Sequence, residues 1–438
     1  MTRKAPVVLK FGGASLSDPK RIAAHVRAAR EAGAPVVLVA SARLGVTDEL
    51  LSALAHPRAR QAHQRIFDRI VAAHPELPAA GRLHVERLRR LLLEVERSYP
   101  RDRPLADRVL SQGERLAVCW LSARLREHEL PAVPVESDHL GLITDNAYGA
   151  SCILFDRSTP AVRVNLRRII SRGQLPVVTG YFGRSMEGRV ATLGRGGSDY
   201  SAAGIGALIG ASRVELVKRN VSVLTADPRL VPSARPIARL SYEEAEELAQ
   251  FGARVLHPLT IEPARANRIL LQVRALDVAD SVTTIGPARQ GGGIRALTIL
   301  TPLRLLRIRV PGGRQRPGVV SEVSARLAGA KVNLVQLFTS SALLCLLLEP
   351  RSGGAARRAL SPLTAEAAVA VDGPYPVALV TAIGDGVLRE ISRIPPEVSR
   401  RILGFSATPR ALSLAVPQTY GRRALRALHR TLVERESP

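Results

Sequence analysis

The sequence predicts an α/β protein in which helices sandwich a parallel-rich sheet, followed by two small α+β domains of the βαββαβ type. Apolar runs at 6–11 and 35–40 read as strands, with a helical stretch from Asp18 to about Ala32 between them. This strand–helix–strand order is typical of parallel sheets covered by helices. Beyond residue 303 two shorter rounds of strands and helices follow, which indicates a pair of small α+β domains.

The other elements of the first part follow in chain order. Residues 55–130 are arginine-rich and helical in pattern, with apolar residues repeating along one helix face from Leu88 to Val95. Residues 176–183 predict another strand, after which a glycine loop leads into a helix of small residues. An acidic helix is expected within 241–258, with Ser241 as its N-cap.

The second part begins after a glycine-rich stretch at 286–293, the best candidate for a linker. We therefore expect a large domain and a linker, followed by two small domains, the second of them short. An alternative arrangement interleaves the two small domains. The expected boundaries of the four regions are 1–286, 287–302, 303–372 and 373–438.

The chain carries a large surplus of positive charge. Its 438 residues include 63 Lys and Arg against 38 Asp and Glu, a formal net charge of +25, and only five of these cations are lysine. Such a surplus attracts phosphates, nucleic acid or acidic partners. Because the arginines are spread along the chain and aromatic residues make up only 3 %, we favour an arginine-biased composition and do not expect a nucleic-acid-binding protein.

Cysteine and histidine patterns point to no metal centre and no disulfide scaffold. The three cysteines lie far apart, and the nine histidines form no HxxxH or HExxH pattern. No apolar run approaches the length of a membrane span, and the N-terminus lacks the apolar core of a signal peptide. We expect a cytoplasmic protein without a membrane partner and without a metal bound directly by side chains.

A glycine pair follows the first predicted strand, in the segment from Lys10 to Ser15. Glycines allow backbone N–H groups to approach a phosphate closely, and the lysine can neutralise a phosphoryl group during transfer. Gly12 and Gly13 do not form a GxxxxGK[ST] or GxGxxG motif. On its own the pair is equally typical of an ordinary turn.

A second glycine cluster runs from Gly194 to Asp199 and opens the small-residue helix. Asp199 can be a simple cap at the start of that helix. A cap does not require three glycines and an arginine. An anion site in which Arg195 donates two hydrogen bonds to a carboxylate is therefore at least as well supported.

The third cluster is Ser111-Gln-Gly-Glu114, after an apolar helix. In the simpler interpretation it starts a helix, with Glu114 in the first turn. In the functional interpretation the Glu114 carboxylate binds the ammonium group of a substrate.

Together these clusters resemble the aspartokinases, which have the amino acid kinase fold. KFGGAS (10–15), SARLGVTDEL (41–50), SQGE (111–114) and TGYFG (179–183) resemble motifs of that family, and TLGRGGSDYSA (192–202) and the stretch from TADPR to VLHP (225–258) are the most specific matches. The two small domains resemble the tandem ACT domains that regulate this family.

The resemblance implies transfer of the γ-phosphate of ATP to the β-carboxylate of L-aspartate, giving 4-phospho-L-aspartate at the entry to lysine, threonine and methionine biosynthesis. ATP and Mg²⁺ are the implied cofactors, with Mg²⁺ carried by the phosphates. Lys10 and Asp199 are the implied catalytic residues, since Lys10 would stabilise the transferring phosphate and Asp199 would organise that site.

The resemblance also implies binding roles. Glu114 would hold the α-ammonium group of aspartate and Arg195 its α-carboxylate, with Thr47 and Ser198 beside the substrate. The expected ATP-binding residues are Lys10, Gly12, Gly13, Ser41, Gly196, Gly197, Lys218, Arg219, Leu224, Arg229, Arg254 and Val255. Four of them, Lys218, Arg219, Leu224 and Arg229, lie in the segment 218–229 described next.

One segment departs from the family pattern. Where the family reads roughly TDVDGVYTADPR, residues 218–229 read KRNVSVLTADPR. Two aspartates and a tyrosine near the adenine and ribose are thereby lost, the tyrosine at Leu224. Either Lys218 and Arg219 contact the phosphates instead and activity survives, or the chain is a degenerate or altered-substrate homologue that binds amino acids; we favour activity.

Further expectations concern assembly and regulation. The resemblance implies a homodimer and an amino-acid effector, lysine or threonine, at the ACT-like domains. The alternative is that these domains serve only dimerisation.

Overall fold

The computed structural model describes residues 4–97, 102–219, 222–252, 256–277, 281–288, 292–309, 318–340, 343–365 and 369–434. It divides into two compact units, which are treated separately below. Unit 1 comprises residues 1–223, 236–246 and 254–288, and unit 2 comprises residues 224–235, 247–253 and 289–438.

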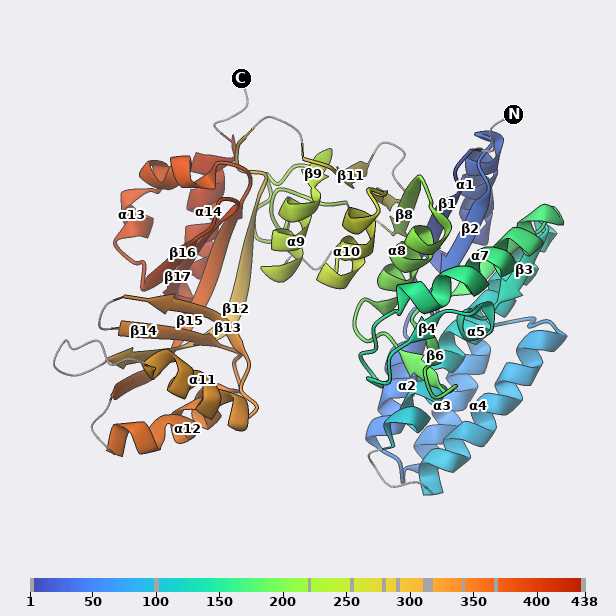
Figure 1. Ribbon diagram of the computed structural model, residues 1–438, viewed down its shortest axis with the longest axis horizontal. Helices are drawn as coiled ribbons and strands as arrows, with labels where there is room; N and C mark the ends of the chain where they lie inside the picture. Colours follow the sequence, from blue (N-terminus) through green and yellow to red (C-terminus); the bar gives the residue numbers. More distant parts are fainter. Residues whose placement is uncertain are drawn as a thin grey trace. The chain divides into compact units, whose positions relative to one another are not determined.

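An eight-stranded sheet forms the centre of unit 1 (Figure 1). Neighbouring strands run parallel except for the β10–β11 pair. In spatial order the strands are β3 (Ala132–Val135), β5 (Leu175–Thr179), β2 (Val36–Ala40), β1 (Val7–Phe11), β8 (Arg213–Lys218), β10 (Leu270–Ala275), β11 (Val282–Gly286) and β9 (Arg239–Ser241).

Helices surround this sheet and confirm the predicted fold class. They are α1 (Pro19–Glu31), α2 (Val46–Ala55), α3 (Arg60–Ala72), α4 (Ala79–Arg97), α5 (Arg103–Glu127), α6 (Ser137–Leu140), α7 (Phe155–Ser171), α8 (Gly197–Ile209), α9 (Tyr242–Gln250) and α10 (Pro258–Ala266). The expected Ser241 cap is present, because its hydroxyl accepts from the Glu244 N–H while the Glu244 carboxylate accepts from the Ser241 N–H.

Alternation along β1 places one lysine on the side of the sheet where α8 lies. Val7, Leu9 and Phe11 belong to a core shared with α1 and α5. Successive residues of a strand face opposite sides, so Val8 and Lys10 face away from that core. Val8 lies next to Gly206 of α8, and Lys10 pairs with a residue in the first turn of the same helix.

A small second sheet lies beside α5 and completes unit 1. Its strands are β4 (Ile143–Thr144), β6 (Phe182–Ser185) and β7 (Val190–Thr192), with β6 in the middle. The buried Asp107 of α5 accepts hydrogen bonds from the Thr192 N–H at 2.7 Å and the Thr192 hydroxyl at 2.8 Å. These bonds fix the end of β7 against α5.

Unit 2 contains one six-stranded sheet (Figure 1). In spatial order its strands are β13 (Leu334–Thr339), β14 (Leu343–Leu348), β12 (Ala296–Arg309), β15 (Ala370–Ile383), β17 (Ala411–Pro417) and β16 (Gly404–Ala407). The long strands β12 and β15 pair antiparallel from Ala296–Ile383 to Arg309–Ala370. Strands from both expected small domains therefore share this sheet, and residues 296–302, expected as linker, are the first half of β12.

Two apolar cores cover different parts of this sheet. One forms beneath α11 (Val319–Gly329) and α12 (Gly353–Ala365), and the other beneath α14 (Gly421–Leu432). Between β15 and β16 the chain forms only a 3-10 helix (Val387–Arg393) and the one-turn α13 (Pro396–Ser399). Pro395 is the N-cap of α13 and Pro396 its first residue, and these prolines prevent the preceding 3-10 helix from continuing into it.

Candidate active site

A cavity of about 860 Å³ in unit 1 brings together segments that are far apart in the sequence. It lies among the ends of β1 and β2, helices α2 and α5, and the glycine loop before α8. Nine of the predicted site residues line it: Lys10, Ser41, Thr47, Glu114, Arg195, Gly196, Gly197, Ser198 and Asp199. The size is typical of a pocket for a small-molecule ligand.

Two lysines share one buried carboxylate at the floor of this cavity. The Asp199 carboxylate lies 2.5 Å from the Lys10 ammonium and 3.1 Å from that of Lys218. Burial alone would raise the pKa of Asp199, but the two ammonium groups lower it below its usual value. The cluster keeps an excess positive charge beside the N-terminus of α8, a combination that favours an anionic ligand.

Both the backbone conformation and the packing at position 196 require glycine. Gly196 is the N-cap of α8 with φ of 73°, and an added Cβ would lie 2.5 Å from the Cβ of His257. His257 thus packs against the glycine loop. Burial lowers its pKa, and Arg195 adds to the effect.

Replacing Gly196 by alanine is expected to destabilise the fold by more than the roughly 1–2 kcal/mol that a left-handed backbone costs an L-residue, because a clash with His257 is added. Gly188 is a matched control, since its φ is 80° and an added Cβ would meet no atom within 4 Å. Urea denaturation of both variants measures the difference. Equal losses for G196A and G188A would contradict the packing role.

Glu114 has a free oxygen in the wall of the cavity. It is 2 % exposed, and its Oε1 accepts from the Ala42 N–H at 3.0 Å, whereas Oε2 has no hydrogen-bond partner among the described residues. Burial raises its pKa to about 8. A buried carboxylate with an unused oxygen fits a ligand that brings a positive charge or a hydrogen-bond donor.

The structure corrects the simpler interpretation of Ser111–Glu114 as a helix start. Helix α5 begins at Arg103, and the side chain of Asp102 caps it. The helix continues through Gly113, where an added Cβ would lie 2.8 Å from the Cβ of Ala42. Gly113 thus lets α5 approach the loop after β2 closely enough for Glu114 to bond its backbone.

Several cavity residues were not predicted from the sequence, among them Arg103, Asp107, Tyr148, Tyr181 and Thr192. Tyr181 adopts a φ of 74°, which is uncommon for a residue other than glycine. Burial raises the pKa of its hydroxyl to about 12. The TGYFG motif gives a signal for this position, but the backbone conformation cannot be read from it.

The remaining predicted residues lie outside the cavity lining. Gly12 and Gly13 directly follow β1, where the Gly12 N–H donates to the Val217 carbonyl. Arg219 instead contacts Asp277 and the hydroxyl of Ser17.

Leu224 and Arg229 belong to unit 2, where Arg229 pairs with Asp227. Arg254 and Val255 lie outside the described residues.

Comparisons with known proteins agree on one family. Residues 5–275 match the amino acid kinase family. An aspartokinase of Thermus thermophilus is 27 % identical over 97 % of this chain and 98 % of its own length. One from Corynebacterium efficiens is 31 % identical over 75 % of this chain and 69 % of its own.

Solved structures of E. coli aspartokinase III are similar over 98 % of this chain and 99 % of their own. The complex with aspartate and ADP (R-state) gives a TM-score of 0.80 at 25 % identity. The complex with lysine and aspartate (T-state) gives a TM-score of 0.76 at 26 % identity.

Proposed function

The chain belongs to the amino acid kinase family, as a homologue of the aspartokinases, and from this premise we propose that it phosphorylates the β-carboxylate of L-aspartate with ATP. One observation carries the proposal. A single cavity is lined by an acceptor for an ammonium group (Glu114), a cation for a carboxylate (Arg195) and a lysine at the end of β1 (Lys10). These are the groups needed to orient an amino acid against a phosphoryl donor.

The reaction follows from this orientation. With the α-ammonium group on Glu114 and the α-carboxylate on Arg195, the β-carboxylate is directed toward Lys10. One of its oxygens attacks the γ-phosphorus, a new P–O bond forms, and the bond to the β-phosphate oxygen breaks to release ADP. The attacking carboxylate is already ionised at neutral pH, so no general base is required.

Lys10 stabilises the charge that moves during transfer. Asp199 acts through the lysines, since its contacts hold Lys10 and Lys218 in place. The altered segment thus contributes Lys218 to the phosphate site. We keep Gly12, Gly13, Leu224, Arg229, Arg254 and Val255 as proposed nucleotide contacts on the basis of the motifs alone.

Mg²⁺ is proposed to enter with the nucleotide. The carboxylates that line the cavity have other partners: Asp199 contacts two lysines, Asp107 accepts from Gly149 and Thr192, and the free oxygen of Glu114 is assigned to the substrate ammonium group. Phosphate oxygens and water are ordinary Mg²⁺ ligands. Bound in this way, the ion would neutralise charge on the transferring phosphate.

Unit 2 is proposed to be a regulatory unit built from two interleaved ACT-like domains. The shared six-stranded sheet and the lysine complex of E. coli aspartokinase III support this proposal. We propose an amino-acid effector, lysine before threonine, and a homodimer. Among the described residues, no helix has the length and apolar character required to cross a membrane.

The pKa of Glu114 predicts the pH dependence. Because only its ionised form attracts the substrate ammonium group, and its pKa is about 8, kcat/KM for aspartate should rise about tenfold between about pH 7 and pH 9. Bound substrate stabilises the carboxylate, so kcat at saturation should change less. Initial rates at several pH values measure both. A flat profile for kcat/KM would contradict the role of Glu114.

The proposed function is tested by ADP formation in the presence of ATP, Mg²⁺ and L-aspartate. The account predicts ADP release that depends on aspartate and is not supported by the amide asparagine, which lacks the attacking carboxylate. Release of ADP at the same rate without aspartate would show that the cavity does not accept this substrate.

A further inference from the structure

A second cavity, of about 480 Å³, lies on another face of helix α5. Helix residues three, four and seven apart share a face. Asp107, Leu110 and Glu114 line the active-site cavity, while Arg108, Ser111, Gln112 and Arg115 line the second one. The remaining lining residues are Arg87, Arg90, Leu91, Glu94 and Val190. The helix thus separates the two cavities, and the second is not a subsite of the first.

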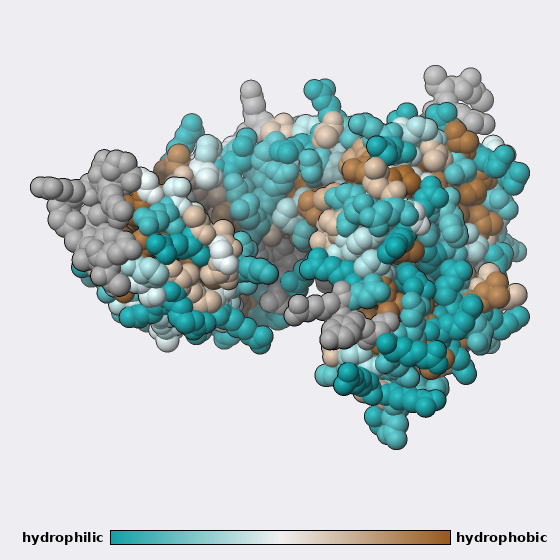
Figure 2. Space-filling view, turned by 60° about the horizontal axis from the view of Figure 1, so that its bottom comes forward, coloured by the Kyte–Doolittle hydropathy of each residue, from teal (hydrophilic) through white to brown (hydrophobic). Residues whose placement is uncertain are grey.

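The rim of the second cavity is strongly positive. Arg87 and Arg90 are exposed and lie one turn apart on α4, and neither has a carboxylate partner among the described residues. Arg108 binds Glu94 through two hydrogen bonds, at 2.8 and 3.0 Å. Two guanidinium groups therefore remain uncompensated at the entrance. The face drawn in Figure 2 is predominantly hydrophilic, as expected for an arginine-rich surface.

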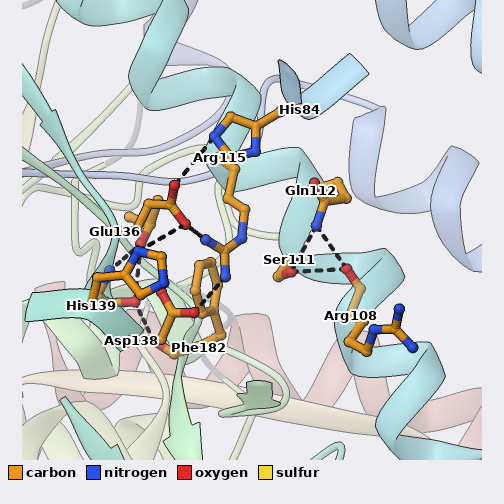
Figure 3. A network of polar contacts seen from close by, with 11 residues as sticks. His84, Arg108, Ser111, Gln112, Arg115, Glu136, Asp138, His139 and Phe182 are labelled. Carbon is orange, nitrogen blue, oxygen red and sulfur yellow. Dashed lines mark hydrogen bonds and ion pairs between the residues drawn. The ribbon is translucent and has the colours of Figure 1, made fainter. Parts of the chain in front are cut away.

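The floor is buried and polar. Ser111 is fully buried, and Gln112 and Arg115 are each 2 % exposed. Figure 3 shows the Arg115 guanidinium between Glu136 and Asp138, and it donates to Asp138 at 2.6 Å. The Nε–H of Arg115 nevertheless has no acceptor among the described residues. A buried donor without a partner costs free energy.

Gln112 also leaves one atom unused. Its amide nitrogen donates to the Arg108 carbonyl at 3.0 Å and contacts the Ser111 hydroxyl (Figure 3). The amide cannot be reversed without placing its oxygen against that carbonyl oxygen. Its Oε1 is therefore the free atom, and no donor among the described residues reaches it. The floor offers a donor from Arg115 and an acceptor from Gln112.

We propose that this cavity binds a small phosphate monoester that carries a hydroxyl group. A phosphate monoester is close to a dianion at neutral pH, which matches the charge of the two uncompensated guanidinium groups. The paired N–H donors of each guanidinium also fit two phosphate oxygens. The hydroxyl group satisfies the Gln112 oxygen, and an ester or phosphate oxygen satisfies the Arg115 N–H. Nothing in the proposed aspartate kinase reaction uses these residues.

Calorimetric titration of the whole protein tests the proposal, with glycerol 3-phosphate and inorganic phosphate as probes. Saturating ADP and aspartate are present throughout, and the variants distinguish binding in this cavity from binding at the γ-phosphate position beside Lys10. Arg87→Ser with Arg90→Ser should weaken binding of both probes about tenfold to a hundredfold. The double variant Arg65→Ser with Arg168→Ser removes the same charge from exposed positions on α3 and α7 and should bind like the wild type.

Gln112→Met provides a second test because it removes the acceptor, together with the amide N–H bond to the Arg108 carbonyl, and leaves every guanidinium group in place. It should lower the affinity for glycerol 3-phosphate more than that for inorganic phosphate. No binding by the wild type, or equal affinity in both double variants, would overturn the proposal. Tighter binding of malate, a hydroxyl-bearing dicarboxylate, would overturn the assignment to phosphate. Failure of these tests leaves the aspartate kinase assay unaffected, since no active-site residue is changed.

Discussion

Replacing Lys10 by alanine is expected to lower kcat about 10²- to 10³-fold while the protein remains folded. The ammonium group of Lys10 is the closest cation to Asp199 and lies at the end of β1, where the transferring phosphate is proposed to sit. Removing it takes away charge stabilisation that grows in the transition state. Asp199 keeps the ammonium of Lys218 as a partner, so the substitution does not leave a buried carboxylate without a counter-charge.

Lys20→Ala is the matched control, because Lys20 is an exposed lysine on α1. Its kcat should equal that of the wild type. Thermal unfolding monitored by circular dichroism should show that K10A is folded. Undiminished turnover in folded K10A would remove Lys10 from the mechanism.

Glu114→Gln is expected to raise the KM for aspartate about tenfold to a hundredfold, with little change in the KM for ATP. Glutamine keeps the size of the side chain and an oxygen for the Ala42 N–H. It loses the negative charge and can present an amide N–H group to the substrate ammonium. The substitution therefore weakens the interaction that orients the amino acid and leaves the nucleotide contacts in place.

Glu86→Gln, at an exposed position of α4, is the control for loss of one negative charge. It should leave both KM values unchanged. Steady-state kinetics with each substrate varied in turn distinguishes the outcomes. An effect of E114Q confined to ATP would show that Glu114 belongs to the nucleotide site instead.

Local patterns predicted the elements that carry the site. The apolar runs of β1 and β2, the helix that follows Asp18 and the Ser241 cap are encoded within a few residues, and the structure contains all of them. The glycine motifs could be placed for the same reason. Once the family resemblance supplied roles, nine predicted residues came together in one cavity.

Long-range contacts account for what the sequence did not predict. The position of Gly113 inside a long helix depends on Ala42, and the contact of Arg219 depends on Asp277. Neither partner is near in the chain. The start of β12 was expected to be linker, because its pairing with β15 involves residues more than sixty positions away.

The altered segment 218–229 bears on the choice between an active kinase and a degenerate homologue. Lys218 faces Asp199 in unit 1, whereas Arg219 is held by Asp277. One of the two proposed replacements thus contacts the carboxylate that we propose to organise the phosphate site. This favours retained phosphoryl transfer over simple loss of nucleotide binding.

The most direct test is trapping of the acyl phosphate product with hydroxylamine, using purified protein, ATP, Mg²⁺ and L-aspartate. We expect aspartyl hydroxamate from the wild type and from K20A, and about 10²- to 10³-fold less from K10A. Hydroxamate formation confirms that the β-carboxylate receives the phosphate. No hydroxamate from folded wild-type protein would contradict the central claim and support an amino-acid-binding homologue without this activity.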